Sequence, residues 1–409
     1  MIVPFRNFWI KSRNLKRKVV NCSMESKMVN KKFIYADHAA TSALDPEAFE
    51  AMKEFLVDNF ANPSQPYSFA RNAKKAIQNA RKTIAECINA DEDEIFFTSC
   101  GTESNNWVIK SILYQNQKKG IITSNIEHHA ILEACKRIEK FKDYYSTYIQ
   151  VNSNGLVNPE ALKKQFNIYN DVYLTSIMYA NNEYGAIQPI KELASISHQN
   201  GSLFHTDAVQ AVGHVAIDVK DLNVDMLSSS AHKFNGPKGI GFLYIKRGLD
   251  ISSLINGGSQ EKGKRAGTEN VASIVGMSTA LKNNCNKLKE NTRHILMLEE
   301  VLLRKLKESD LDFICNTNVN HIPGNISLSF KGISGETLMH RLDLKGIMVS
   351  TGSACDSAKN QTSHVIKALG VPEDYAYGTI RISLGKENTE DEIEEIFIAI
   401  NEIVKSLTV

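Results

Sequence analysis

The sequence predicts an α/β fold in which a large domain, built on a largely parallel sheet, is followed by a smaller α+β domain. Short apolar runs alternate with helical stretches from residue 46 onward, which is the pattern of parallel strands joined by crossover helices. A long helical stretch around 271–308 then leads to a second set of runs. The 409 residues, 42% hydrophobic and 23% charged, are enough for two such globular domains.

The elements can be assigned in chain order. "DPEAFEAMKEFL" predicts a helix with Asp45 as its N-cap and Pro46 at its first position. A second helix is predicted across 68–88. Strands of the main sheet are predicted at the apolar runs 94–99, 120–124, 172–178, 201–207, 224–230 and 240–246. The later set, which includes "NISLSF" and "TIRISLG", is predicted to form the smaller domain.

Charge and cysteine content exclude several classes of protein. Lys+Arg 48 against Asp+Glu 46 nearly cancels, so we expect no direct nucleic-acid binding. No apolar run approaches the roughly 20 residues of a membrane span. The seven cysteines are scattered and form no C-x-x-C pair, which favours a reducing cytoplasmic compartment over a disulfide framework or a structural zinc site.

Residues 1–30 differ from the rest of the chain, because basic residues predominate and Glu25 is the one acid up to Lys27. This composition resembles a transit peptide. It also fits a dispensable tail or an upstream start codon, because Met24 and Met28 stand just before the first strand-like run. We favour the tail or start-codon interpretation and expect a disordered extension.

Polar residues follow several predicted strands, at the edge where parallel sheets bind ligands. "FFTSCGTESNN" passes from strand to helix, and the backbone N–H groups of Gly101 and Thr102 could bind an anion. "IEHHAI" offers His128 and His129, of which at most one is expected to face a site. "MYANNEYG" ends its strand near Asn182. Each signal is weak by itself, because an ordinary strand-to-helix turn, or a hydrogen-bonded histidine without a role, would have the same sequence pattern.

"FHTDAVQ" ends its strand with Asp207, and Gln210 follows three residues later. A carboxylate there could pair with a buried cation or a protonated ring nitrogen, or could cap a helix. In "SSSAHKFNGPKGIG", the residues Ser230, His232 and Lys233 also follow a strand. No G-x-x-x-x-G-K-[ST] pattern occurs there, so a P-loop is excluded. Lysine is most often a solvated charge, but beside a phosphate-binding serine it could form a Schiff base with pyridoxal phosphate.

Pyridoxal phosphate would account for these positions together. Its phosphate needs a helix N-terminus and hydroxyls, its ring nitrogen an acid, its 3′ oxygen a donor and its ring face a flat side chain. One candidate for each need is present among Thr102, Ser230, Asp207, Gln210, His128 and Lys233. The sequence therefore predicts this cofactor.

Cys355 lies in "STGSACDSAKN", among small and polar residues with little to pack against. Structural cysteines are usually small, buried and inert. The local sequence leaves open whether Cys355 is a loop residue without a role or a nucleophile on a mobile arm.

The ordered motifs "TESNN", "EHHA", "NNE-G", "HTDAVQ", "SSSAHK", "RAGTEN", "TGSAC" and "IRISLG" resemble those of the cysteine desulfurases of the NifS/IscS type, which use pyridoxal phosphate. The resemblance extends from about Phe33 to the C-terminus. It implies a fold-type-I transferase with a mostly parallel seven-stranded sheet and helices on both faces. It also implies a large cofactor-binding domain at 43–285, and a small domain of 31–42 and 286–409 that carries the cysteine loop.

Carried over residue by residue, the resemblance assigns roles to particular side chains. Lys233 would carry the cofactor, Asp207 would pair with the ring nitrogen, and His128 would stack on the ring and move protons. The other cofactor contacts would be Gln210 at the 3′ oxygen, Asn182, and the phosphate ligands Gly101, Thr102, Ser230, His232 and, from a second subunit, Thr268. Asn182 and Arg381 would bind the substrate carboxylate. Cys355 matches the catalytic cysteine; no dedicated metal site is implied, although Cys355 could ligate a shared iron–sulfur cluster.

The implied activity is conversion of L-cysteine to L-alanine by a homodimer, with sulfur left as a persulfide on Cys355. The sulfur would pass to an acceptor such as an iron–sulfur cluster scaffold or a tRNA-thiolation enzyme. Selenocysteine lyase activity is one alternative. A catalytically silent scaffold in sulfur transfer is another, and the presence of Lys233, Asp207 and Cys355 argues against it. The departures from the family pattern at Ser42–Ala43, Trp107 and Tyr184 remove no catalytic group.

Overall fold

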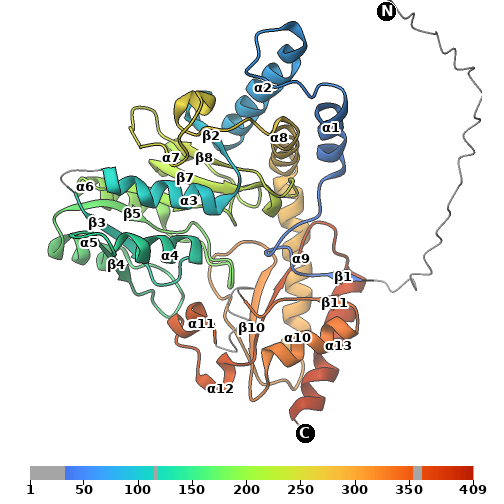
Figure 1. Ribbon diagram of the computed structural model, residues 1–409. Coiled ribbons are helices and arrows are strands. Elements are labelled where there is room, and N and C mark those ends of the chain that lie inside the picture. The colour runs from blue at the N-terminus through green and yellow to red at the C-terminus, as the bar shows by residue number, and fades with distance from the viewer. Residues whose placement is uncertain (1–32, 115–117, 353–361, 409) are drawn as a thin grey trace, which may run out of the picture. The chain divides into compact units, whose positions relative to one another are not determined.

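A seven-stranded sheet forms the centre of the larger part of the protein, as the predicted α/β class requires (Figure 1). The computed structural model describes residues 33–114, 118–352 and 362–408. The strand order is β2-β8-β7-β6-β5-β3-β4, and β7, β6, β5, β3 and β4 run parallel. β8 is antiparallel to both of its neighbours. The strands are β2 (Ile95–Thr98), β3 (Gly120–Ser124), β4 (Tyr145–Ile149), β5 (Val172–Ser176), β6 (Leu203–Asp207), β7 (Met226–Ser230) and β8 (Gly241–Ile245).

The six predicted apolar runs all contain strands of this sheet, because their residues are buried on both faces. The seventh strand, β4, was missing from the predicted runs. It lies at the edge of the sheet, and the first four residues of "YSTYI" are only partly buried. An edge strand needs fewer apolar side chains, so its sequence signal is weaker.

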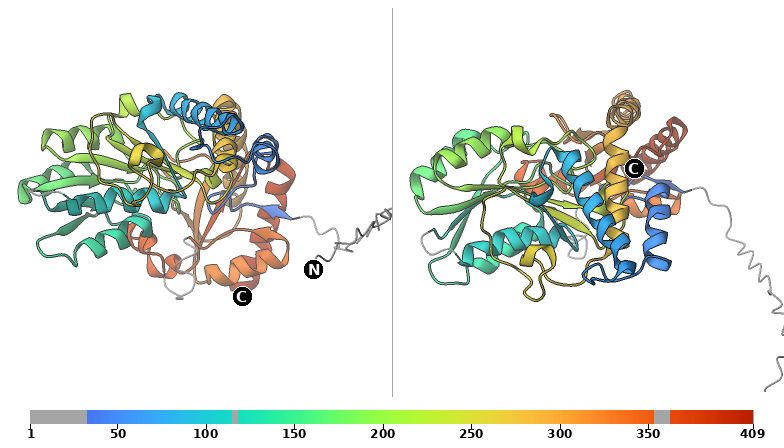
Figure 2. Two further views of the ribbon diagram at one scale, coloured as in Figure 1. Left: turned by 45° about the horizontal axis from the view of Figure 1, so that its top comes forward. Right: turned by 90° about the horizontal axis from the view of Figure 1, so that it is seen from above.

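Helices cover both faces of the sheet, which confirms the predicted layers (Figure 2). One face packs against α3 (Gly101–Lys110) and α4 (His129–Ile138). The hydrophobic core on the other face includes residues of α1 (Pro46–Val57), α2 (Arg71–Ile88), α5 (Pro159–Ile168), α6 (Ile190–Gln199), α7 (Val219–Leu222) and α8 (Val271–Asn286). Among the helices that the structure describes, none has the length and apolarity that a bilayer span requires.

Local sequence signals explain how two of these helices begin and end. The Asp45 carboxylate accepts hydrogen bonds from the N–H groups of Glu47 and Ala48, as an N-cap does, and Pro46 begins α1. α2 ends at Ile88, and its C-cap Asn89 has a left-handed φ of 55°. The long helical stretch predicted around 271–308 is two helices, α8 and α9 (Leu288–Lys307), joined at Lys287.

The smaller part is α+β, as predicted, and has a hydrophobic core of its own. Its antiparallel sheet has the order β12-β10-β9, formed by β9 (Phe313–Cys315), β10 (Asn325–Phe330) and β12 (Thr379–Ser383). A parallel pair joins β1 (Ile34–Tyr35) to β11 (Ile347–Met348). The helices are α9, α10 (Gly335–Leu344), α11 (His364–Ala368), α12 (Glu373–Ala376) and α13 (Glu390–Thr408). The described residues from Phe33 onward form one compact unit, and the finer division at 42–43 and 285–286 stays a prediction.

Candidate active site

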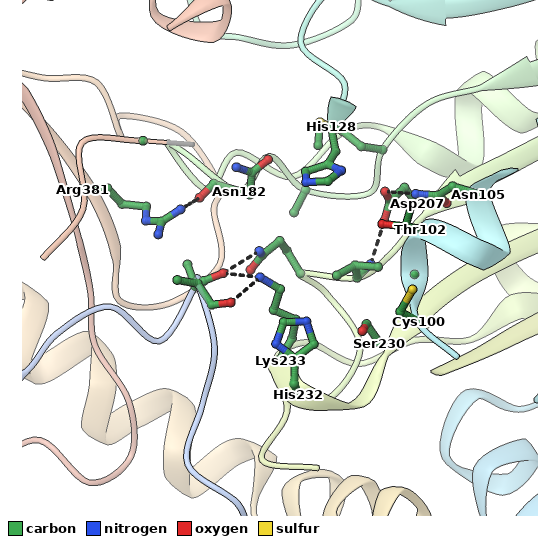
Figure 3. Close-up of a pocket in the computed structure, with 18 residues that line it drawn as sticks. Cys100, Thr102, Asn105, His128, Asn182, Asp207, Ser230, His232, Lys233 and Arg381 are labelled. Carbon is green, nitrogen blue, oxygen red and sulfur yellow. Dashed lines mark hydrogen bonds between the residues drawn. The ribbon is translucent and has the colours of Figure 1, made fainter. Parts of the chain in front are cut away.

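A cavity of about 290 Å³ lies at the carboxyl ends of the parallel strands (Figure 3). Ten residues predicted from the sequence line it: Gly101, Thr102, His128, Asn182, Asp207, Gln210, Ser230, His232, Lys233 and Arg381. Two predicted residues are not among those that line it. Thr268 is exposed, and Cys355 lies outside the described residues.

Lys233 presents a partly buried amine to this cavity. It ends a short 3-10 turn, Ala231–Lys233, that directly follows β7. Its Nζ donates to the carbonyl oxygens of Ala39 at 2.6 Å and Ala40 at 2.8 Å. Burial, with the nearby Arg381 charge as a smaller cause, lowers the pKa of Lys233 to about 8. A fraction of this amine is therefore neutral and nucleophilic near neutral pH.

Asp207 ends β6 and places a carboxylate in the same cavity. Its Oδ2 accepts from Asn105 Nδ2 at 2.6 Å, and its Oδ1 accepts from the Val209 N–H at 3.0 Å. The side chain is almost fully buried, so these two hydrogen bonds determine where the carboxylate points. Gln210 lies close by, and its Nε2 donates to the Ala39 carbonyl at 3.0 Å.

His128 precedes α4 and acts as its N-cap. The Ala130 N–H donates to His128 Nδ1 at 3.1 Å, so the neutral ring carries its proton on Nε2. Burial lowers the pKa of His128, and the Asp207 carboxylate opposes this change. The ring is thus neutral near pH 7. Of the two adjacent histidines, His129 is not among the residues that line the main cavity.

The start of α3 forms an anion-binding end of the cavity. The first N–H groups of a helix have no partner within the helix and attract anions. A β-carbon at Gly101 would lie 2.5 Å from Val209 Cγ2 and 3.6 Å from Ser230 Cβ, so a larger residue would fill this corner. Ser230 and Thr102 add hydroxyl groups. Burial also lowers the pKa of the neighbouring His232 to about 4, so this ring is neutral at pH 7.

A second anion-binding end lies across the cavity, at Arg381 and Asn182 (Figure 3). Arg381, on β12, is only 3% exposed. Its Nη1 donates to the Asn182 carbonyl at 2.8 Å, and its Nη2 donates to Asp37 Oδ1 at 2.6 Å. The guanidinium is thereby held in one orientation beside the cavity. The cavity can accept a ligand with an anionic group at each end and a reactive centre near Lys233.

Sequence reasoning missed several residues that line the cavity, notably Asn105, Cys100 and the Ala39–Ala40 pair. Asn105 was visible in "TESNN", where a buried amide one helical turn after Gly101 could have been noticed. Ala39 and Ala40 act through main-chain carbonyls, which carry no sequence signal.

Comparisons with known proteins show what the chain is similar to. The profile of the family described as Aminotransferase class-V matches residues 34–396. The chain is 46% identical over 379 residues to "Cysteine desulfurase IscS" of Clostridium botulinum, covering 91% of this chain and 95% of the relative. A solved structure described as "NIFS-LIKE PROTEIN" has a TM-score of 0.86 at 38% identity, covering 92% of this chain and all of the other. Another, "SspA in complex with cysteine", has a TM-score of 0.76 at 33% identity, covering 87% of this chain and all of the other.

Proposed function

The chain belongs to the cysteine desulfurases of the class-V aminotransferase family, and we propose that it converts L-cysteine to L-alanine and retains the sulfur as a persulfide on Cys355. One observation carries the proposal beyond family membership. A partly buried amine, Lys233, and a buried carboxylate, Asp207, share one cavity with two anion-binding ends. That is the set of groups needed to hold an aldehyde cofactor and an amino acid together.

The cavity fits pyridoxal phosphate, which members of this family use. The partly neutral Lys233 amine suits covalent attachment of an aldehyde, and Asp207 offers an acceptor for a protonated ring nitrogen. The corner at Gly101, where a β-carbon would collide with Val209, suits a phosphate next to the α3 N-terminus. We assign Gly101, Thr102, Ser230 and His232 to the phosphate, Gln210 to the 3′ oxygen, and His128 and Asn182 to the ring. When bound, the cofactor supplies an electron sink for charge that develops at the substrate α-carbon.

Arg381 and Asn182 would bind the substrate carboxylate. Arginine binds carboxylates through paired N–H donors, and here the guanidinium is already oriented by Asp37 and by the Asn182 carbonyl. Little side-chain entropy is then lost when the substrate binds. This arrangement places the amino group and the side-chain sulfur of cysteine toward the centre of the cavity.

Lys233 and His128 are the groups that can move protons. Lys233 can take the α-proton as a neutral amine, and His128 can exchange a proton through Nε2, because its Nδ1 is engaged by Ala130. The Cβ–Sγ bond of the substrate breaks and its sulfur bonds to the Cys355 sulfur. The β-carbon takes up the proton that the Cys355 thiol gives up, and the α-carbon regains the proton that was removed from it. One cysteine and one thiol thus become one alanine and one persulfide, and no external oxidant is needed.

We assign Thr268 to the phosphate site of a second subunit in a homodimer. Thr268 is exposed and is not among the residues that line the cavity of its own chain. Its loop is held by Arg265, whose Nε and Nη2 donate to the Glu103 carboxylate at 2.8 and 3.1 Å. A fixed but exposed hydroxyl of this kind suits a contact across an interface. The sulfur acceptor is expected to be a cluster scaffold or a tRNA-thiolation enzyme.

The proposed function is tested by the variant Cys355→Ala. Cofactor binding uses other residues, so the variant should keep the cofactor spectrum of the parent. Formation of alanine from cysteine and of alkylatable persulfide should both be lost, because no thiol accepts the sulfur. Cys315→Ala, on β9, serves as a matched control and should keep both products. Alanine production by Cys355→Ala at the parent rate would refute the role of this residue.

A further inference from the structure

Asn105 is the side chain that binds the Asp207 carboxylate most closely, at 2.6 Å, although the two residues are 102 positions apart. Asn105 is 1% exposed and Asp207 is 5% exposed, so water does not compete for this contact. Figure 3 shows the pair at the edge of the cavity nearest to α3. The contact therefore joins α3, whose start forms the anion-binding end, to the Asp207 carboxylate.

The orientation of the Asn105 amide is set by Asp207. Its Oδ1 is buried and has no hydrogen-bond partner among the described residues. If the amide were turned over, that oxygen would face a carboxylate oxygen, and two acceptors would repel each other. The amide thus leaves its own oxygen unpaired in order to donate to Asp207.

Asn105 is held rigidly, because α3 is fixed to its surroundings on both sides of this residue. Ser104 Oγ lies 2.8 Å from Thr98 Oγ1 on β2, and Trp107 Nε1 donates to the Ser252 carbonyl at 2.7 Å. A donor on a rigid helix can fix the direction of a carboxylate more precisely than one on a loop.

We propose that Asn105 is a positioning residue that fixes the Asp207 carboxylate for the ring nitrogen of the cofactor, while the start of the same helix binds the phosphate. The inference rests on the proposed function. The helix α3 would then determine the distance between the phosphate of the cofactor and the Asp207 carboxylate that pairs with its ring nitrogen. Asp207 also interacts electrostatically with three titratable groups, and its negative charge affects the pKa of each: His128, Lys233 and Glu127.

The test compares Asn105→Asp with Asn106→Asp. Both substitutions add the same charge to the same turn of α3. Asn106, however, donates to the Thr102 carbonyl and is not among the residues that line the main cavity. Asn105→Asp replaces the donor with a second carboxylate against Asp207, so a proton must be shared between them. Each apoprotein is titrated with pyridoxal phosphate, and the Kd and the visible spectrum are recorded.

Asn105→Asp should weaken pyridoxal phosphate binding about tenfold to a hundredfold, which is the loss typical of a hydrogen bond to a charged group. Its visible spectrum should also change, and kcat should fall while KM for cysteine stays close to the parent value, because Arg381 is untouched. Asn106→Asp should lose less affinity than Asn105→Asp and keep the visible spectrum of the parent, because its side chain is bonded to the Thr102 carbonyl and not to Asp207. Equal Kd values and spectra for the two variants would overturn the inference. A parent protein that makes no alanine from cysteine would instead overturn the proposed function.

Two further variants distinguish a positioning role from a purely structural effect. One is Asn105→Ala, and the other is the exchanged pair, the double variant Asn105→Asp with Asp207→Asn. The alanine variant removes the donor without adding charge, and its folded apoprotein should still bind pyridoxal phosphate more weakly than the parent. The exchanged pair can form the same hydrogen bond in reverse, so its apoprotein should recover thermal stability relative to Asn105→Asp. Cofactor affinity should stay low, because the carboxylate is on the wrong side. Recovery of the parent Kd in the exchanged pair, or a parent Kd for Asn105→Ala, would refute a positioning role.

Discussion

Asp37 and Arg381 form an ion pair in which Nη2 and Oδ1 lie 2.6 Å apart; the Arg381 side chain is buried and that of Asp37 is partly exposed. Asp37 follows β1 near the start of the described chain, and Arg381 lies on β12 near its end. Burying a guanidinium is costly unless it is paired and hydrogen-bonded. Asp37 and the Asn182 carbonyl meet that need, which keeps a positive charge beside the cavity.

Arg381→Lys should therefore raise KM for cysteine about tenfold to a hundredfold, because an ammonium cannot keep both contacts and present paired donors to a carboxylate. The effect on kcat should be smaller. Steady-state kinetics measure both values. Arg341→Lys, on the exposed face of α10, is the matched control and should behave as the parent. An unchanged KM for Arg381→Lys would contradict the assignment of the substrate carboxylate.

The amine of Lys233 should attach the cofactor faster as the pH rises. Its pKa of about 8 means that half of the amine is neutral at that pH and that the neutral fraction levels off about one pH unit higher. The rate at which apoprotein recaptures pyridoxal phosphate, followed by absorbance, should rise from about pH 7, reach half of its maximum near pH 8 and level off above about pH 9. After borohydride reduction, peptide mapping should find the cofactor on Lys233. Lys238→Ala should keep this profile and Lys233→Ala should lose it, whereas label on another lysine would refute the assignment.

Mixing two weakened variants should restore activity if Thr268 acts across the dimer interface. In a heterodimer of Lys233→Ala and Thr268→Ala, one site would carry both substitutions and the other neither. Activity after subunit exchange should therefore exceed that of either variant separately. If exchange is verified and no activity returns, Thr268 does not serve a neighbouring site.

Stability should decrease in acid partly through His205. Its ring is fully buried between the Ser176 and Ser228 hydroxyls, each 2.9 Å away, and burial lowers its pKa from 6.5 to about 3. Below pH 6.5 the unfolded chain takes up a proton that the folded protein does not, so stability is lost as the pH falls. The loss for this one group approaches about 1.4 kcal/mol per pH unit.

His205→Gln should show a shallower decrease of the unfolding free energy between about pH 6.5 and about pH 5. Urea unfolding of the apoprotein at several pH values gives this slope for parent and variant. Equal slopes would show that His205 is not a source of the acid sensitivity. Any change in stability at pH 7 is separate and reports the lost hydrogen bonds.

The sequence by itself predicted the fold class, six of the seven strands of the main sheet and the start of α1. Those features depend on local patterns: buried runs of apolar residues, and a cap such as Asp45 with Pro46. It also named ten residues that line the cavity: nine end or follow strands of the main sheet, whose carboxyl ends meet at one edge, and Arg381 came from the family resemblance. β4 escaped prediction because an edge strand is half exposed and less apolar.

Only the tertiary structure decided which groups hold those residues in place. The Lys233 amine binds the carbonyls of Ala39 and Ala40, and Arg381 binds Asp37, across 194, 193 and 344 positions of the chain respectively. Asp207 likewise receives its hydrogen bond from Asn105 on a different layer of the fold. These contacts depend on how the segment after β1 and the helix α3 pack against the strand ends. A local sequence pattern contains no information on that packing. Every residue has a main-chain carbonyl, and the sequence does not show which group a carbonyl or an asparagine side chain will contact.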